Sequence, residues 1–246
     1  MTSRPSAGSL VLVRHGQSTA NAAGLFTGIL DPALSATGAD EARASAELLL
    51  SNGLVPDALF VSPLKRATQT ARIIAETLSI PAAEVTVDWR LTERNYGALT
   101  GRLKDDVRTE FGESQFLAWR RSVDTAPPAM ADEQFAPFQN SALFQGLPTR
   151  ALTRTESLRD VMARVTEFHD ERVLPQLAMG RTVLIVAHGN SLRAYCAVLE
   201  QLDKSAIHRL NLPTGHPLVY ADGTRRYLDA ERAEAAALAL TLDGGT

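Results

Sequence analysis

Short apolar runs rich in β-branched residues recur along the chain and are typical of strands buried on both faces of a parallel sheet. They occupy residues 9–13, 58–61, 85–87 and 182–187. The run at 182–187 is the strongest of the four. The pattern therefore predicts four buried strands.

Stretches of helical composition lie between these runs. Residues 34–51 are rich in Ala, Glu and Leu and are followed by Asn52-Gly53, which favours the end of a helix. Further helices are predicted at about 63–78, where Pro63 stands at the helix start, and at about 191–202. Two late strands, near an edge of the sheet, are predicted at 217–220 and 225–228. Because strands and helices alternate, we predict an α/β fold, with a mostly parallel central sheet and helices on both faces, in a single domain spanning 1–246.

Two segments depart from this alternation. Residues 123–154 contain four prolines and have weak periodicity, which predicts a lid-like insertion, with a disordered insertion as the alternative. The tail from Ala230 onward has high helix propensity and no proline or glycine before its last residues. We expect this tail, about 230–246, to be mobile, above all at its end, 243–246.

Composition narrows the classes of function. The chain has 246 residues and a formal net charge of −3, so it has no global attraction for nucleic acids or acidic membranes. Its one cysteine, Cys196, excludes an internal disulfide, a paired-cysteine redox motif and a cysteine-rich zinc module. No apolar run approaches the roughly 18 residues that span a bilayer. The first predicted strand begins near Ser9 and leaves no room for a signal peptide, so we expect a cytoplasmic protein.

Arginine outnumbers lysine by 22 to 3 among the 25 basic residues. The planar guanidinium group binds phosphates and carboxylates in a bidentate manner, so the excess suits an oxyanion clamp. Codon bias is the alternative reading of the count alone. Individual arginines therefore have to carry the argument.

Two of the predicted strands end in a His-Gly pair. Arg14-His15-Gly16 follows the first strand, and His188-Gly189 follows the run at 182–187. Ligands of parallel α/β sheets bind at the carboxyl ends of the strands, so both histidines are expected in one crevice. Imidazole is a capable nucleophile at neutral pH, and Arg14 would neutralise a phosphoryl group bound there. Two unrelated core histidines are the alternative.

Two further residues belong to the same edge of the sheet. Arg66 lies at the start of the helix after the second strand, where a cation is disfavoured unless an anion binds nearby. Glu93 follows the third strand and suits general acid/base chemistry.

A longer set of motifs accompanies these residues in order. They are Phe26-Thr27-Gly28, residues 93–101, Trp119-Arg120-Arg121, Pro127-Pro128, residues 155–158, residues 188–193, residues 211–215 and residues 217–220. With Arg14-His15-Gly16 and Arg66, they make the chain similar to the cofactor-dependent phosphoglycerate mutases of the histidine phosphatase superfamily. The similarity runs from about Leu10 to Tyr220.

The resemblance implies roles for individual residues. His15 would carry a phosphoryl group as phosphohistidine, in a pocket with Arg14, Arg66 and His188, and Glu93 would be the acid/base. The residues implied to bind substrate in the phosphoryl pocket are Ser18, Asn21, Thr27, Gly28, Gly189 and Asn190. Those implied to form a second anion site are Arg94, Tyr96, Lys104, Arg120 and Arg121.

The resemblance also implies an activity. The enzyme would interconvert 3- and 2-phosphoglycerate, would be primed by 2,3-bisphosphoglycerate, would need no metal, and would form a homodimer or homotetramer. The sequence departs from the family pattern at Gln17, Ala20, the Ile29-Leu30 pair and the tail after Tyr220. Because these positions surround the expected entrance, a phosphomonoesterase that transfers the group to water is the alternative. A catalytically silent protein that binds phosphorylated metabolites is a third hypothesis.

Overall fold

A single six-stranded sheet forms the centre of the computed structural model, which describes residues 8–81 and 84–242. The strand order is β3-β2-β4-β1-β5-β6. The first four strands of that order run parallel, β5 pairs antiparallel with β1, and β6 pairs antiparallel with β5. The strands are β1 (Leu10–Arg14), β2 (Ala58–Val61), β3 (Val85–Val87), β4 (Val183–Ala187), β5 (Leu218–Ala221) and β6 (Thr224–Tyr227). The prediction of a mostly parallel sheet with an edge of late strands is confirmed.

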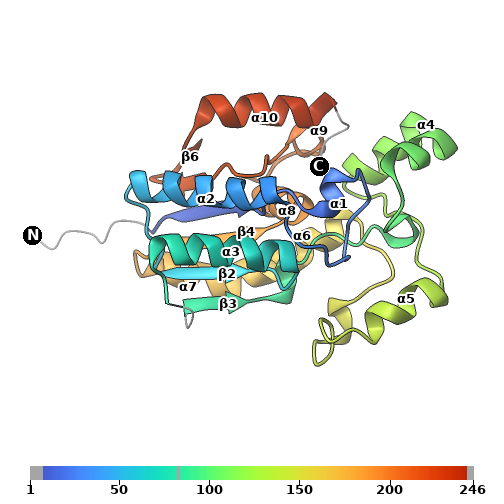
Figure 1. Ribbon diagram of the computed structural model, residues 1–246, viewed down its shortest axis with the longest axis horizontal. Coiled ribbons are helices and arrows are strands. Elements are labelled where there is room, and N and C mark those ends of the chain that lie inside the picture. The colour runs from blue at the N-terminus through green and yellow to red at the C-terminus, as the bar shows by residue number, and fades with distance from the viewer. Residues whose placement is uncertain (1–7, 82–83, 243–246) are drawn as a thin grey trace, which may run out of the picture.

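Helices surround this sheet (Figure 1). They are α1 (Thr19–Ala22), α2 (Ala36–Ser51), α3 (Lys65–Leu78), α4 (Lys104–Arg121), α5 (Asp132–Gln139), α6 (Leu158–Phe168), α7 (Leu174–Ala178), α8 (Gly189–Leu199), α9 (Lys204–Arg209) and α10 (Ala230–Leu242). Short 3₁₀ turns η2 (Trp89–Leu91), η3 (Gly97–Leu99) and η4 (Thr149–Ala151) and a π-helical turn η5 (His169–Val173) complete the elements described. Within the described ranges, no helix is both long enough and apolar enough to span a membrane.

The alternation of side chains along the strands determines which helices cover each face. Leu10 and Leu12 of β1 pack in one hydrophobic cluster with residues of α6 and α8. Val11 and Val13 point to the other face and pack with residues of α2 and α3. Apolar residues on both faces bury the central strands between two helical layers, which is why β2 and β4 contain no polar residue. Figure 1 shows α2 and α3 in front of the strands, with α4 and α5 projecting beyond one end of the sheet.

The predicted helices agree with the structure except at their ends. The helix predicted at about 191–202 begins earlier, at Gly189, and ends earlier, at Leu199. It begins directly after His188 because the Ser191 hydroxyl accepts a hydrogen bond from the His188 amide at its first turn. It ends early because Gln201 takes a left-handed conformation, with φ of 50°.

Several helices were not predicted, α4 and α5 among them. In α4, Gly112 has φ of 79° and interrupts the helical conformation, so the periodicity changes halfway along. Helix α5 lies inside the proline-rich segment 123–154 and contains Pro137. This segment packs Met130, Phe135 and Phe144 against Ile29 in a small hydrophobic cluster of its own. The helix propensity of the tail is confirmed by α10, whereas residues 243–246 lie outside the described residues.

A contact between two glycines fixes the loop after β1 against α2. A Cβ atom on Gly16 would lie 2.0 Å from the Gly38 carbonyl oxygen, and one on Gly38 would lie 2.0 Å from the Gln17 carbonyl oxygen. Only glycine at both positions permits this backbone approach. The contact sets the path of the chain immediately after His15.

This contact predicts that Gly38→Ala lowers the free energy of unfolding by about 1–3 kcal/mol, because the new methyl group overlaps the Gln17 carbonyl oxygen. In an ordinary helix the same change raises stability by about 0.5–1 kcal/mol. Urea unfolding monitored by circular dichroism measures the difference. Thr37→Ala, at an exposed position of the same helical turn, is the control and should not lower stability. A more stable Gly38→Ala variant would contradict the contact.

Candidate active site

His15 lies directly after β1, and its backbone amide donates to the Ala187 carbonyl oxygen of β4 at 2.9 Å. Its ring Nδ1 is 2.6 Å from the Gly16 carbonyl oxygen. A carbonyl oxygen only accepts, so Nδ1 carries the proton and Nε2 carries the lone pair. Nε2 in turn accepts a hydrogen bond from Arg66 Nε at 3.2 Å. The backbone therefore presents Nε2 as the nucleophilic nitrogen.

Arg66 is fully buried near the start of α3. Its two terminal nitrogens donate to backbone carbonyl oxygens, Nη1 to Leu30 at 2.7 Å and Nη2 to Gly28 at 2.9 Å. Burial lowers the pKa of the guanidinium to about 10, partly opposed by the negative charge of Glu93. Arg66 therefore stays cationic at neutral pH, next to the nucleophilic nitrogen.

His188 directly follows β4 and lies beside His15, with ring centroids 4.8 Å apart in an edge-to-face arrangement. Its Nε2 is 2.7 Å from the Ser62 hydroxyl, which follows β2. Burial, and then the positive charge of Arg66, lower the pKa of both histidines well below the usual value. Both rings are consequently neutral at pH 7. The convergence of the two His-Gly junctions predicted from the sequence is confirmed.

Glu93 lies in the buried loop between η2 and η3. Its Oε1 accepts from the Arg94 amide at 2.7 Å, and its Oε2 accepts from the Asn190 amide at 3.2 Å. Asn190 belongs to the first turn of α8, where unpaired amides and the helix dipole favour negative charge. The carboxylate is thus held at the end of the sheet that also carries His188.

His15, Arg66 and Glu93 line a cavity of about 350 Å³, the size of a small-molecule site, whereas His188 is fully buried beside His15 and does not line it. Its walls carry four cationic side chains, Arg14, Arg66, Lys104 and Arg120, and one carboxylate, Glu93. The whole chain has a formal net charge of −3, whereas the side chains that line this cavity carry more positive than negative charge. The other lining residues are His15, Gln17, Asn21, Leu25, Phe26, Thr27, Gly28, Tyr96, Asn190, Pro213, Thr214, Ala236, Ala239 and Leu240.

Lys104 and Arg120 come from opposite ends of α4. In a straight helix, 16 residues would separate them by about 24 Å. The positive φ at Gly112 bends the chain so that both side chains reach one cavity. A second cationic region therefore faces the same space as His15.

Tyr96 lines the cavity and accepts a hydrogen bond at its hydroxyl from the Asn190 side chain at 3.0 Å. Burial alone would raise the pKa of the phenol, but the charges of Arg94 and Arg120 outweigh it and lower the pKa to about 8. The Arg94 guanidinium lies over the Tyr96 ring, 4.5 Å from its centroid.

Four residues expected from the sequence to bind substrate do not line the cavity: Ser18, Arg94, Arg121 and Gly189. Ser18 caps α1 by bonding Asn21. Arg94 donates to the Trp119 carbonyl oxygen at 2.6 Å, behind the cavity wall. Arg121 donates to the carbonyl oxygens of His208 and Leu210. In this structure the two arginines orient α4 and the loop after α9.

The tail forms one wall of the cavity, at the entrance where the resemblance placed it. Ala236, Ala239 and Leu240 of α10 line one wall. Asn211 holds this helix, because its side-chain amide donates to the Thr241 hydroxyl at 2.9 Å. Apart from the resemblance, the signal in the sequence was a helix rich in small apolar residues after the last strand, which does not show which of its residues face the site.

Among the positions that depart from the family pattern, Gln17 lines the cavity together with the tail residues Ala236, Ala239 and Leu240. The Ser35 hydroxyl donates to Gln17 Oε1 at 2.9 Å. Ala20 and Ile29 are buried elsewhere. In the part of the chain that the structure describes, no group of three or more His, Cys, Asp or Glu residues is placed to hold a metal ion.

The lowered pKa values of His15 and His188 predict how stability depends on pH. Both rings bind protons more weakly in the folded state than in the unfolded chain, whose histidines titrate near 6.5. Stability is therefore complete above about pH 6.5 and falls as the pH decreases, by up to about 1.4 kcal/mol per pH unit for each histidine. Urea unfolding between pH 7 and 5 measures this slope. It should be shallower in His15→Gln and His188→Gln, and an unchanged slope in both variants would refute the neutral pair.

Comparisons with known proteins agree with this geometry. A family model described as the histidine phosphatase superfamily (branch 1) matches residues 10–143 and 135–224. A 2,3-bisphosphoglycerate-dependent phosphoglycerate mutase from Thermobifida fusca is 46% identical over 96% of this chain and 99% of its own length. A protein of the same name from Corynebacterium efficiens is 41% identical over 97% of this chain and 98% of its own length.

A solved structure of a mycobacterial glucosyl-3-phosphoglycerate phosphatase with VO3 has a similar fold, with a TM-score of 0.67. Its sequence is 27% identical to this one, and the matched region covers 90% of this chain and 96% of that chain. By its family model and by its nearly full-length similarity to these relatives, the chain belongs to the histidine phosphatase superfamily and, within it, to the family of 2,3-bisphosphoglycerate-dependent phosphoglycerate mutases.

Proposed function

We propose that this enzyme interconverts 3-phosphoglycerate and 2-phosphoglycerate through a phosphohistidine at His15. The observation that carries the proposal is one cavity holding a neutral histidine with Nε2 facing Arg66, a carboxylate at Glu93, and a further cationic region at Lys104 and Arg120. A phosphatase needs only the first of these regions. A mutase must also hold the other end of its substrate.

In the first half-reaction, His15 Nε2 attacks phosphorus, so that a P–N bond forms and the ester P–O bond breaks. Arg14 and Arg66 neutralise the charge on the phosphoryl oxygens, and the amides of the first turn of α8 add to this field. Glu93 donates a proton to the leaving oxygen. When 2,3-bisphosphoglycerate is bound, it supplies the phosphoryl group that primes His15.

In the second half-reaction, phosphohistidine transfers its phosphoryl group to the free hydroxyl of a bound monophosphoglycerate, and His15 afterwards takes a phosphoryl group from the other position. Glu93 accepts the proton of the attacking hydroxyl while the P–N bond breaks. Lys104 and Arg120 hold the far anionic group and keep the molecule bound while it exchanges positions. A cavity of about 350 Å³ accommodates that reorientation of a small molecule.

The apolar wall supports transfer to a hydroxyl over transfer to water. Ala236, Ala239 and Leu240 of α10 present no polar group to the cavity, and an excluded solvent limits hydrolysis of a reactive intermediate. The phosphomonoesterase alternative keeps one supporting observation, since a solved structure of similar fold is named a phosphatase.

Some properties stay predictions from the sequence or from the resemblance. They are a homodimer or homotetramer, a cytoplasmic location, a single domain, a lid function for segment 123–154 and a mobile tail. The single thiol is buried, and burial raises the pKa of Cys196 to about 12, so this side chain is an unreactive core group.

A two-product assay tests the proposal. With 3-phosphoglycerate, a trace of 2,3-bisphosphoglycerate and excess chelator, we expect rapid formation of 2-phosphoglycerate and little free phosphate.

His15→Ala should abolish turnover and the trapping of radiolabelled phosphate on the denatured protein. Glu93→Gln should slow transfer by roughly 10²–10⁴-fold. Free phosphate without isomer would identify a phosphatase instead.

The second cationic region gives a separate prediction. Arg120→Ala should raise the KM for 3-phosphoglycerate by roughly 10- to 100-fold, because a hydrogen bond to a charged group is worth about 1.5–3 kcal/mol. The KM for p-nitrophenyl phosphate, which has no second anionic group, should change much less. Arg108→Ala is the matched control, since Arg108 lies on the same helix but does not line the cavity. Equal losses with both substrates would count against a second anion site.

A further inference from the structure

The loop that carries Glu93 has no regular secondary structure of its own. Residues 92–96 are all buried, and they lie between two short 3₁₀ turns, η2 and η3. Buried backbone groups need hydrogen-bond partners, and an irregular loop obtains them from other segments. What holds this loop therefore determines where the Glu93 carboxylate lies.

On the C-terminal side of Glu93, the loop is held by Glu156. One of its carboxylate oxygens, Oε2, accepts from the Asn95 amide at 2.9 Å, and the Glu156 amide donates to the Asn95 carbonyl oxygen at 3.0 Å. The Asn95 side chain adds bonds on both sides, because its Nδ2 donates to the Thr153 carbonyl oxygen and its Oδ1 accepts from the Gly97 amide. Asn95 is thus fixed at its backbone and at its side chain.

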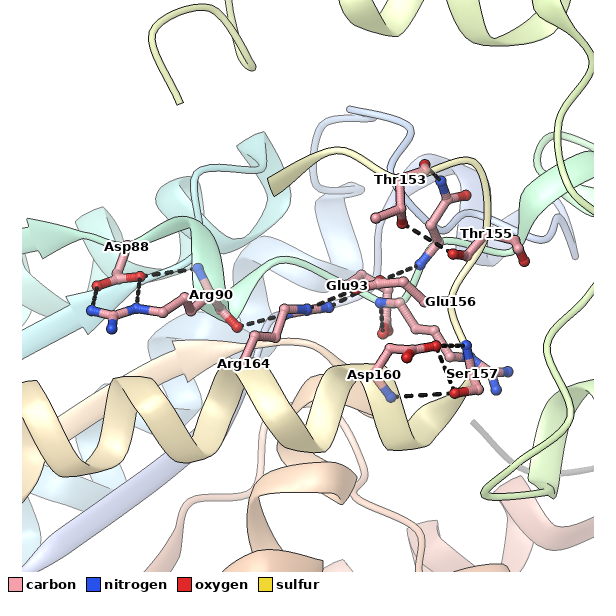
Figure 2. Close-up of polar contacts among 11 residues, drawn as sticks. Asp88, Arg90, Glu93, Thr153, Thr155, Glu156, Ser157, Asp160 and Arg164 are labelled. Carbon is pink, nitrogen blue, oxygen red and sulfur yellow. Dashed lines mark hydrogen bonds and ion pairs between the residues drawn. The ribbon is translucent and has the colours of Figure 1, made fainter. Parts of the chain in front are cut away.

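On the N-terminal side, the loop is held by Arg164 of α6. Its Nη1 donates to the carbonyl oxygen of Arg90, three residues before Glu93. The same guanidinium binds Glu156, with Nε 2.9 Å from Oε1 and Nη2 3.2 Å from Oε2. Figure 2 shows Arg164 between the Arg90 carbonyl and the Glu156 carboxylate, with the helix α6 beneath them. One ion pair therefore spans both ends of the Glu93 loop.

This ion pair is buried, with exposed side-chain fractions of 8% for Arg164 and 12% for Glu156. Its location also couples it to the rest of the site. Helix α6 packs against α8, whose first turn supplies the Asn190 amide to Glu93. Glu93, Glu156 and Arg164 line one small hollow. A buried ion pair adds little to stability compared with an apolar pair, so its value lies in fixing a geometry.

We propose that Glu156 and Arg164 are positioning residues, which hold the Glu93 carboxylate in place for proton transfer by fixing Asn95 and Arg90. Neither residue lines the main cavity. The inference rests on the proposed function, because it assumes that Glu93 moves the proton. The motif at residues 155–158 has no part in the reaction steps described above. The inference gives its residue Glu156 a role.

Glu156→Gln tests this role, because glutamine keeps the shape but weakens the charged fork to Arg164. We expect kcat for 3-phosphoglycerate to fall by roughly 10- to 100-fold, with KM unchanged, because a displaced catalytic group lowers the rate of the chemical step. The burst of nitrophenolate released when p-nitrophenyl phosphate phosphorylates His15 should stay at the wild-type rate, because nitrophenolate leaves without needing a proton. Equal losses with both substrates would overturn the inference.

A double-variant cycle provides the second readout. If Glu156 acts through Glu93, then Glu93→Gln combined with Glu156→Gln should be no slower than Glu93→Gln alone. Losses that multiply would show an independent, structural effect and overturn the inference. If Glu93→Gln itself slows both substrates equally, the acid/base assignment fails, and with it the proposed function. If Glu93→Gln is selective and Glu156→Gln is not, only the positioning role fails.

Two further variants separate positioning from folding. Glu156→Leu combined with Arg164→Leu replaces the ion pair with apolar groups, which preserves stability in many proteins, yet it removes the acceptor of the Asn95 amide. We expect a folded enzyme with the same selective loss of kcat, and full activity in this variant would contradict the proposal. Glu200→Gln is the matched control. Glu200 pairs with Arg225 at the far end of α8, and this variant should keep wild-type turnover.

Discussion

Burial of positive charge is the constraint on which the rest of this structure depends. Arg66, Arg94, Arg120 and Arg193 are among the largest fully buried side chains of the described residues. A buried guanidinium loses its hydration and is tolerated only when its N–H groups find acceptors. In this chain many of those acceptors are backbone carbonyl oxygens rather than carboxylates. Gly28 and Leu30 serve Arg66, and Leu212 serves Arg14.

This choice of acceptors has a chemical consequence. Neutral carbonyl oxygens satisfy the hydrogen bonds of the arginines without cancelling their charge. The cavity therefore keeps a surplus of positive charge that an oxyanion can neutralise. Burial first, and then this positive field, lower the pKa of His15 and His188 and keep both rings neutral. An uncharged imidazole beside a cationic wall can act as a nucleophile toward a phosphoryl group, whereas an imidazolium cannot.

The irregular loops are explained by the same constraint. Segments 25–30, 92–97 and 210–214 have little regular secondary structure, so their carbonyl oxygens and amides are available to side chains. Each such loop must then be held by other elements. Glycine packing holds the loop after His15, the Glu156–Arg164 pair holds the loop of Glu93, and Asn211 links the loop after α9 to α10. Rigid helices thus support loops that carry the chemistry.

The sequence by itself determined the sheet and the centre of the site. Apolar runs of strand length and the two His-Gly pairs are local patterns, and the geometry of parallel strands brings His15 and His188 together independently of the intervening residues.

The cationic cavity wall was decided only by the tertiary structure. Lys104 and Arg120 share the cavity because Gly112 bends α4, whereas the neighbouring Arg121 turns to backbone carbonyls. The apolar wall from α10 and the hold of Glu156 on Asn95 likewise join residues that are distant in sequence. A local pattern reports which face of an element is apolar, but the partner of a buried charge depends on which distant segment packs against it.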